Sequence, residues 1–173
     1  MKLQNVVPAA VSATVLALSA TAASAGGTLT AVATASVTVL APVTLQATQG
    51  LDFGAVTKPG NAGANTITLD AASNLVTLTG TGDATKVAGA VSVAKFSIVG
   101  PAGVTYTTTQ NLTFAQPGLT KVSASAPVPA SGALGVIPAS GMQELRFGGA
   151  FDLSAATPVQ AYSGSLTVTV SYN

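Results

Sequence analysis

The chain ends on the sequence GSLTVTVSYN, residues 164–173, in which apolar and polar side chains alternate. Successive side chains of a β-strand point to opposite faces of a sheet, so a period of two predicts a strand with one buried face. The opposite, polar row is formed by serines and threonines. We expect the buried row of this strand to consist of Leu166, Val168, Val170 and Tyr172.

The same alternation occurs near the other end of the chain, over residues 28–43. We expect one long N-terminal strand here, with Pro42 ending or bending it because proline cannot donate a ladder hydrogen bond. The opposite row is mainly Thr and Ser. The apolar row, which continues to Ala41 and Val43, begins with Leu29, Ala31, Ala33, Ala35, Val37 and Val39.

Short runs rich in β-branched residues lie between these two segments, separated by Gly/Pro turn sequences such as Lys58-Pro59-Gly60-Asn61. No stretch shows a helical period, and residues 126–141 are predicted to form a long loop. About ten short strands at this spacing predict an all-β sandwich or barrel. We expect strands at 52–56, 65–69, 75–80, 91–99, 104–109, 112–115, 120–124, 144–147 and 150–153.

The first 25 residues have the features of a secretory signal peptide. Lys2 is followed by an apolar stretch over residues 6–20 and by the small-residue site Ala23-Ser24-Ala25, which predicts cleavage before Gly26. The apolar run is interrupted and shorter than the roughly 20 residues of a membrane span. We therefore expect residues 26–173 to form a single exported domain, located in the periplasm, at the surface or outside a Gram-negative bacterium, with no transmembrane span.

Charge is scarce in this sequence. Charged residues make up 6% of the chain, against about 25% in an average globular protein. The six basic and five acidic residues become five and five once Lys2 is removed with the signal peptide. A neutral chain without clustered Lys or Arg does not attract nucleic acid. A neutral surface does favour association with other copies, because little charge repulsion separates them.

Residues suited to catalysis are few. The chain has no histidine and no cysteine, so the commonest general base, the thiol nucleophile and the usual transition-metal ligands are missing. Two carboxylates could still meet as a glycosidase pair, but a lone Asp beside a turn usually bonds its own backbone. We expect no enzyme, no catalytic residue, no metal site and no cofactor. The acids that this concerns are Asp52, Asp70, Asp83, Glu144 and Asp152.

Aromatic residues mostly fall within or beside the expected strands, and the chain has no tryptophan. This distribution predicts core positions rather than an exposed platform for stacking sugars. In the triplet Asp52-Phe53-Gly54, we expect Phe53 in the core and Gly54 at a bulge or a close backbone approach.

The order of several motifs resembles a bacterial secreted family known as domain of unknown function 4402. The resemblance covers nearly all of residues 26–173 and implies an exported β protein, without implying an activity. Its motifs are residues 51–54 (LDFG) followed by a Pro-Gly turn, 96–100 (FSIVG), 104–106 (VTY) and 162–173 (YSGSLTVTVSYN).

The last strand also resembles the end of a chaperone–usher pilus subunit, with alternating apolar residues and Tyr172 in the penultimate place. This resemblance implies an immunoglobulin-like antiparallel β-sandwich of eight to ten short strands, completed by the N-terminal strand of the next subunit. Residues 28–43 would be that donor strand. The chain departs from the pattern in having no disulfide and in carrying Gln160 where such subunits often have glycine.

Two hypotheses for the function follow. The first is a non-enzymatic structural or adhesive surface protein, a pilus-like subunit assembled by β-strand addition. Its partners would be copies of itself or other surface subunits, and a periplasmic chaperone. Edge strands without protective charges support this hypothesis, because a monomer normally protects such edges. The second is a monomeric secreted β-sandwich that binds a ligand such as a polysaccharide.

Overall fold

The structure is a computed structural model that describes residues 30–39, 41–130 and 132–172. It divides into two units, Met1–Val37 and Thr38–Asn173. The expected signal peptide, residues 1–25, and Leu29 lie outside the described residues. In the first unit, residues 30–37 are exposed and in no strand. Residues 30–39 and 41–43 pair with no strand of this chain, and the strand expected over 28–43 stays a prediction, because alternation makes a strand only where a neighbouring strand pairs with it.

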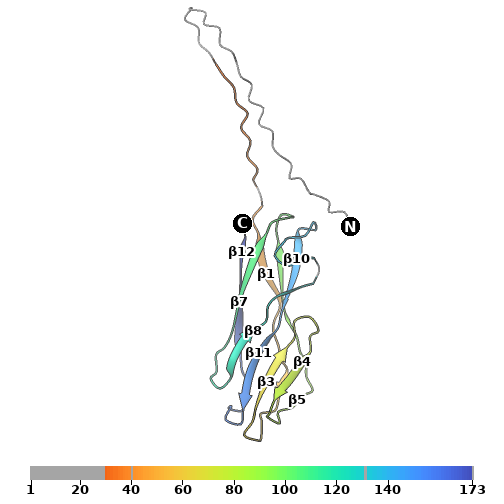
Figure 1. The fold of residues 1–173 in the computed structure, drawn as a ribbon, viewed down its shortest axis with the longest axis vertical. Coiled ribbons are helices and arrows are strands. Elements are labelled where there is room, and N and C mark those ends of the chain that lie inside the picture. Colours follow the sequence, from red (N-terminus) through yellow and green to blue (C-terminus); the bar gives the residue numbers. More distant parts are fainter. Residues whose placement is uncertain (1–29, 40, 131, 173) are drawn as a thin grey trace, which may run out of the picture. The chain divides into compact units, whose positions relative to one another are not determined.

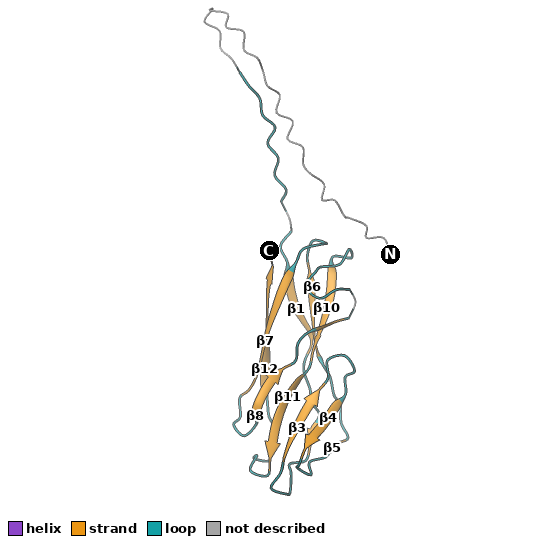
Figure 2. Cartoon of the chain, viewed as in Figure 1, coloured by secondary structure: helices purple, strands orange, loops and turns teal. Residues whose placement is uncertain are grey.

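The second unit is built from strands and loops, and the described residues contain no helix (Figure 2). All of its strand pairs are antiparallel. The strands are β1 (Thr44–Gln49), β2 (Ala55–Val56), β3 (Ala64–Leu69), β4 (Val76–Gly80), β5 (Lys86–Val87), β6 (Ala94–Val99), β7 (Tyr106–Phe114), β8 (Thr120–Ala124), β9 (Val128–Pro129), β10 (Met142–Phe147), β11 (Gly149–Ser154) and β12 (Gly164–Tyr172).

These strands form four antiparallel sheets, with orders β1-β6-β10-β9, β4-β3-β11-β8, β12-β7 and β2-β5 (Figure 1). Strands β3 and β10 alternate between buried and less buried residues, as expected for strands with one face on a core. The predicted all-β antiparallel sandwich is confirmed.

Apolar side chains gather in two clusters along the sandwich. The first cluster contains Phe53, Ile67, Leu69, Val93, Leu112, Phe151 and Leu153. The second contains Ala94, Phe96, Ile98, Tyr106, Ile137, Leu145 and Phe147. Leu51 and Leu166 pack against both clusters, so the two halves of the core are continuous.

The predicted strand positions are partly correct. Strand β8 has its predicted bounds, and β3, β10, β11 and β12 lie where strands were expected. The runs at 104–109 and 112–115 form one strand, β7, and most of 52–56 is not in a strand. Residues 126–141, predicted as a loop, contain β9 and the buried Ile137. Strand β1 was not predicted, because its sequence TLQATQ is mostly polar.

One end of the second unit holds both the start of β1 and the end of β12 (Figure 1). A Cβ added to Gly100 would contact Val43 and Ile137, and the amide of Gly103 donates to the Ile137 carbonyl at 2.8 Å. Tyr172 at the end of β12 pairs with Tyr106 in the same region. Strand β1 leads away from this end and β12 leads toward it.

Candidate assembly groove

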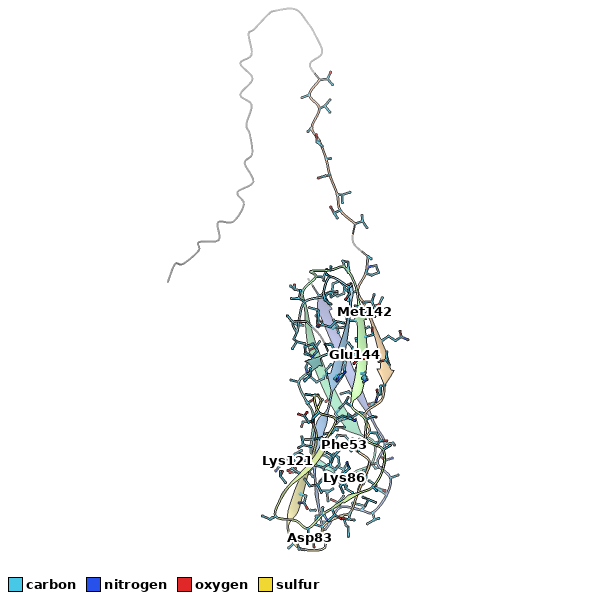
Figure 3. All side chains as sticks on the ribbon, turned by 90° about the vertical axis from the view of Figure 1, so that its right-hand side faces the viewer. Phe53, Asp83, Lys86, Lys121, Met142 and Glu144 are labelled. Atoms are coloured by element: carbon cyan, nitrogen blue, oxygen red, sulfur yellow. The ribbon has the colours of Figure 1, made fainter. Side chains whose placement is uncertain are left out.

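A cavity of about 810 Å³ penetrates the sandwich between residues 50–58 and residues 157–166. Both of these stretches are largely exposed, so the cavity opens to solvent. We call it the groove. Its floor is made of apolar core side chains, and Figure 3 shows one of them, Phe53, within this half of the unit. The apolar residues that line it include Leu51, Phe53, Leu112, Phe114, Leu119, Phe151, Leu153 and Leu166.

Aromatic rings pack edge to face along the floor of the groove. The Phe53 and Phe151 centroids are 5.0 Å apart at an interplanar angle of 78°, and those of Phe114 and Phe151 are 5.8 Å apart at 77°. Tyr162 continues the row, 6.5 Å from Phe114 at 87°. Such T-shaped pairs are favourable beyond the area that they bury. The floor is therefore packed although one side of it faces solvent.

One rim of the groove, residues 157–163, is fixed to the connection between β7 and β8. The Thr157 hydroxyl donates to the Gly118 carbonyl at 3.2 Å. The Ser163 amide donates to the Gln116 side-chain oxygen at 2.7 Å, and the Ala115 amide donates to the Ser163 carbonyl at 2.8 Å. These bonds hold the rim open over the floor, so the groove is already formed before anything binds.

The other rim contains the triplet Asp52-Phe53-Gly54. Asp52 and Ser92 exchange two backbone hydrogen bonds of 2.8 and 2.9 Å, and an Asp52 carboxylate oxygen accepts from the Gly54 amide at 2.8 Å. Gly54 has a φ of +72°, and a Cβ there would lie 3.1 Å from the Ala90 carbonyl oxygen. Phe53 is buried. The predicted core position of Phe53 and the close approach at Gly54 are confirmed.

The groove continues into an unpaired strand edge. Strand β12 pairs with β7 through all nine of its residues, and no other strand in the described part of the chain pairs with it. Strand β1 likewise pairs with β6 and with no second described strand. Leu166 lines the groove and belongs to β12. A strand from another molecule could therefore contact the apolar floor of the groove and form hydrogen bonds with the free backbone groups of β12.

The side chains predicted to form the buried row of the C-terminal strand are only partly buried in the structure. Leu166, Val168 and Val170 are half-buried and pack against the second apolar cluster. Tyr172 does not join the core, since it is 51% exposed. It lies at the last pair of the β12–β7 ladder, opposite the buried Tyr106, where the strand passes the end of the core.

The predicted assembly row at the N-terminus is exposed wherever the structure describes it. Val37 and Val39 expose 87% and 88% of their surface. Two exposed valines separated by a single residue are unfavourable in water, because each adds apolar surface that a partner could remove. The other described members of the row are Ala31, Ala33 and Ala35.

Four of the five acidic side chains contact backbone amides or a nearby basic side chain. Asp70 accepts from the amides of Ala72 and Ser73 at 3.0 and 2.6 Å, which lowers the pKa of Asp70, mainly through Ser73. Asp83 accepts from the amides of Asn61 and Gly60, and these bonds lower the pKa of Asp83. Asp70 thus bonds its own turn, as predicted for an acid beside a turn, whereas Asp83 bonds a turn 22–23 residues away in the sequence. The remaining two acids of this group are Asp52, described above, and Glu144, which pairs with Arg146 at 3.1 Å.

Asp152 is the fifth acid and belongs to β11. Its carboxylate pairs with the Lys121 ammonium at 2.9 Å and accepts a hydrogen bond of 2.5 Å from the Thr66 hydroxyl. These contacts, Lys121 first, hold the pKa of Asp152 below its usual range. Within the described ranges, no three acids come together in an arrangement that could hold a metal ion.

Sequence reasoning missed the groove itself. Its aromatic floor was expected in the core, but nothing in the linear pattern indicated that Phe53, Phe114 and Phe151 would border solvent. The available signal was the stretch between β11 and β12, residues 155–163, which no strand prediction covered. This stretch forms most of one rim.

Fold and site together define an antiparallel β-sandwich with a solvent-accessible apolar groove beside the free edge of its C-terminal strand. Residues 43–172 match the model of the family described as Domain of unknown function (DUF4402), and the chain belongs to this family. No curated protein and no solved structure matches the chain. In the described part of the chain, there is no helix long and apolar enough to cross a membrane.

Proposed function

We propose that the protein is an exported, non-enzymatic structural subunit of a bacterial surface assembly, held together by β-strand addition. The observation that carries this proposal is the groove, whose apolar floor leads into the unpaired edge of β12. A strand added there would gain main-chain hydrogen bonds along β12 and would bury apolar side chains on the floor. Both contributions are favourable and neither needs a charged group.

The chemistry of the groove supports a protein partner over a polysaccharide. Leucine and phenylalanine side chains form its floor, whereas sugar sites need polar groups that converge on hydroxyls. Polar side chains of the lining lie on the rims and make internal hydrogen bonds, with Lys58 donating to the Ala155 carbonyl and Gln160 to the Pro117 carbonyl. The Tyr162 hydroxyl on the rim donates to the Pro158 carbonyl at 2.9 Å. The polysaccharide-binding module therefore remains the second candidate, without an observation of its own in its favour.

Assembly is tested with a variant that fills the groove and a matched variant that does not. Leu166→Trp places a large ring into the groove, while Thr167→Trp places the same ring on the exposed face of β12. Material from native cells is analysed by sedimentation velocity. We expect the wild type and Thr167→Trp to form polymers and Leu166→Trp to give a monomer, and a thermal melt checks that this monomer is folded, because Leu166 also packs against both apolar clusters. A wild type that stays monomeric at high concentration contradicts the proposal.

Export is tested separately from assembly. Because Ala23-Ser24-Ala25 is the expected cleavage site, the mature protein should begin at Gly26. Mass spectrometry of the protein from native cells measures this directly. A cytoplasmic species that retains Met1 would show that the protein is not exported.

A further inference from the structure

Strand β4 forms one edge of its four-stranded sheet (Figure 1) and lacks the features that normally protect an edge. Edges are protected by charge, proline, a bulge or shortness, because free backbone groups can pair with another chain. Of the other three edges of the two four-stranded sheets, β9 is short and contains Pro129, β8 carries Lys121 and pairs irregularly, and β1 shifts register between Ala47 and Gln49. Strand β4, VTLTG, has no charge and no proline, and pairs with β3 without a shift.

The ladder between β3 and β4 shows which backbone groups of β4 are free. At the hairpin that joins the two strands, the Asp70 amide donates to the Leu75 carbonyl at 3.0 Å. Bonded and non-bonded pairs alternate in an antiparallel ladder, so Thr77 bonds to β3 while Val76 and Leu78 direct their amide and carbonyl groups away from it. Within the described residues, no group outside this hairpin bonds to the backbone of Val76 or Leu78.

The side chains of this edge suit a second copy of the same edge. Val76 and Leu78 are half-buried and pack at the margin of the first apolar cluster, and Thr77 and Thr79 are exposed on the opposite face. Leu75, just before the strand, is 60% exposed. If two copies of β4 lay antiparallel, apolar side chains would meet on one face, Leu75 would contact a threonine on the other, and no charge would be buried.

We propose that β4 pairs antiparallel with β4 of a second copy, centred on Thr77, and that this contact joins two polymers side by side. In this register Val76 lies opposite Leu78 of the second copy. The free amide and carbonyl groups of both residues in both copies are then all used, in four hydrogen bonds. The contact is isologous, because the same edge serves both copies. This inference rests on the proposed function and adds a lateral contact to it.

The size of the contact explains why it would act between polymers. Stable interfaces involve about 20–30 residues per partner, whereas this edge offers residues 75–79. Two single subunits should therefore stay apart. Along two polymers the same contact repeats from subunit to subunit, and each contact after the first forms at a high effective concentration. The nearly neutral chain adds little charge repulsion between the polymers.

Disulfide trapping tests the register, because the chain contains no cysteine of its own. The two copies of Thr77 would have Cα atoms about 4.5 Å apart, within the range that a disulfide spans. Polymers of the full exported chain with Thr77→Cys should give a reducible covalent dimer on oxidation. Thr79→Cys and Thr68→Cys are matched controls, each about 14 Å from its counterpart, and should give none. A dimer from Thr79→Cys instead would overturn the proposed register.

A charge at the centre of the contact tests the pairing without a cross-link. Thr77→Lys places two like charges directly opposite each other, so its polymers should be single, with half the width of wild-type polymers in electron micrographs. Thr68→Lys adds the same charge one strand away from the edge, and its polymers should stay paired. A mixture of Thr77→Lys and Thr77→Glu polymers should pair again, because opposite charges then meet. Equal loss of pairing in both lysine variants would overturn the inference.

Wild-type polymers separate this inference from the proposed function. If the polymers form but stay single, and Thr77→Cys gives no dimer, the lateral contact is wrong and the proposed function stands. If a folded wild type never polymerises, the proposed function is wrong and the lateral contact is wrong with it.

Discussion

Two segments of this chain carry the same alternating pattern and have different structures. Residues 164–172 form β12, hydrogen-bonded to β7 along its full length. Residues 30–39 are unpaired and exposed. The pattern specifies which side chains share a face of a strand, but a partner strand is needed before that face is buried. Under the proposed assembly this difference is functional: β12 has its partner within the chain, and the N-terminal segment would find its partner on another copy.

The largest effect is expected from Val37→Asp. A charge on the exposed segment does not disturb the folded unit, but it would be buried without a partner in the groove of the next subunit, at a cost of several kcal/mol. We expect complete loss of polymer with an unchanged melting temperature of the monomer. Sedimentation and thermal melts measure both properties. Ser36→Asp, on the polar row, is the matched control and should still polymerise.

The corresponding change in β12 should affect folding as well. Val168 is half-buried against the second apolar cluster, so Val168→Asp should lower the free energy of unfolding by about 2–3 kcal/mol. Thr169→Asp, exposed on the other face, should change it by less than about 0.5 kcal/mol. Urea unfolding monitored by circular dichroism gives both values. Equal effects of the two substitutions would show that the Val168 row does not face the core.

An effect of similar size is expected when the free segment is supplied as a peptide. The Val37→Asp protein keeps an intact groove, so a peptide of residues 28–40 with the wild-type sequence should bind it and stabilise it. At a hundredfold excess over its Kd, the gain is about 2.7 kcal/mol. A rise in melting temperature that depends on peptide concentration is the readout, and a scrambled peptide should give none. If both peptides act alike, the effect is not strand addition.

Acid should have the smallest effect, and it should act on the folded unit. The pKa of Asp152 is lowered in the folded state by Lys121 and then by Thr66, so this carboxylate contributes stability above its unfolded pKa of about 3.9. That contribution is lost as the pH falls through the lower folded pKa. The melting temperature should be constant from pH 5 to 8 and decrease below about pH 4.

Asp152→Asn tests this assignment. The variant should melt a few degrees lower at neutral pH, since the ion pair is partly screened by the exposed Lys121, and its melting temperature should depend less on acid. Residues 30–39 contain no titratable side chain. Polymers that dissociate between pH 5 and 8 while the subunit stays folded would contradict assembly through this segment.

The parts of the fold that follow from local pattern could be predicted. Strands β8 and β12 combine β-branched residues, alternation and flanking turns, and Phe53 was correctly placed in the core. Strand β1 could not be predicted, because TLQATQ becomes a strand through its pairing with β6. Strand β7 was divided in two at Gln110-Asn111, where polar residues interrupt the pattern. The ladder nevertheless continues there, since these two residues pair with Val168 and Thr167.

The candidate site was predictable in its strands and not in its shape. The two alternating segments were identified from the sequence, and so was the aromatic content of the core. The groove depends on the stretch before β12 being held away from residues 50–58 by hydrogen bonds to Gln116 and Gly118. These two hydrogen bonds join residues 47 and 39 positions apart in the sequence, and such long-range contacts leave no local signal.

If subunits assemble as proposed, the pairing of β1 with β6 also determines how each subunit carries mechanical load. A pull on the chain at Pro42 acts along β1, whose hydrogen bonds to β6 run nearly perpendicular to the strand. Loaded in this way the bonds are sheared together, whereas a pull across the ladder would open them one at a time. Strand β12 lies in the same geometry against β7, with nine pairs in register. A fibre made of such units would resist stretching through backbone ladders, in a protein that has no disulfide to share the force.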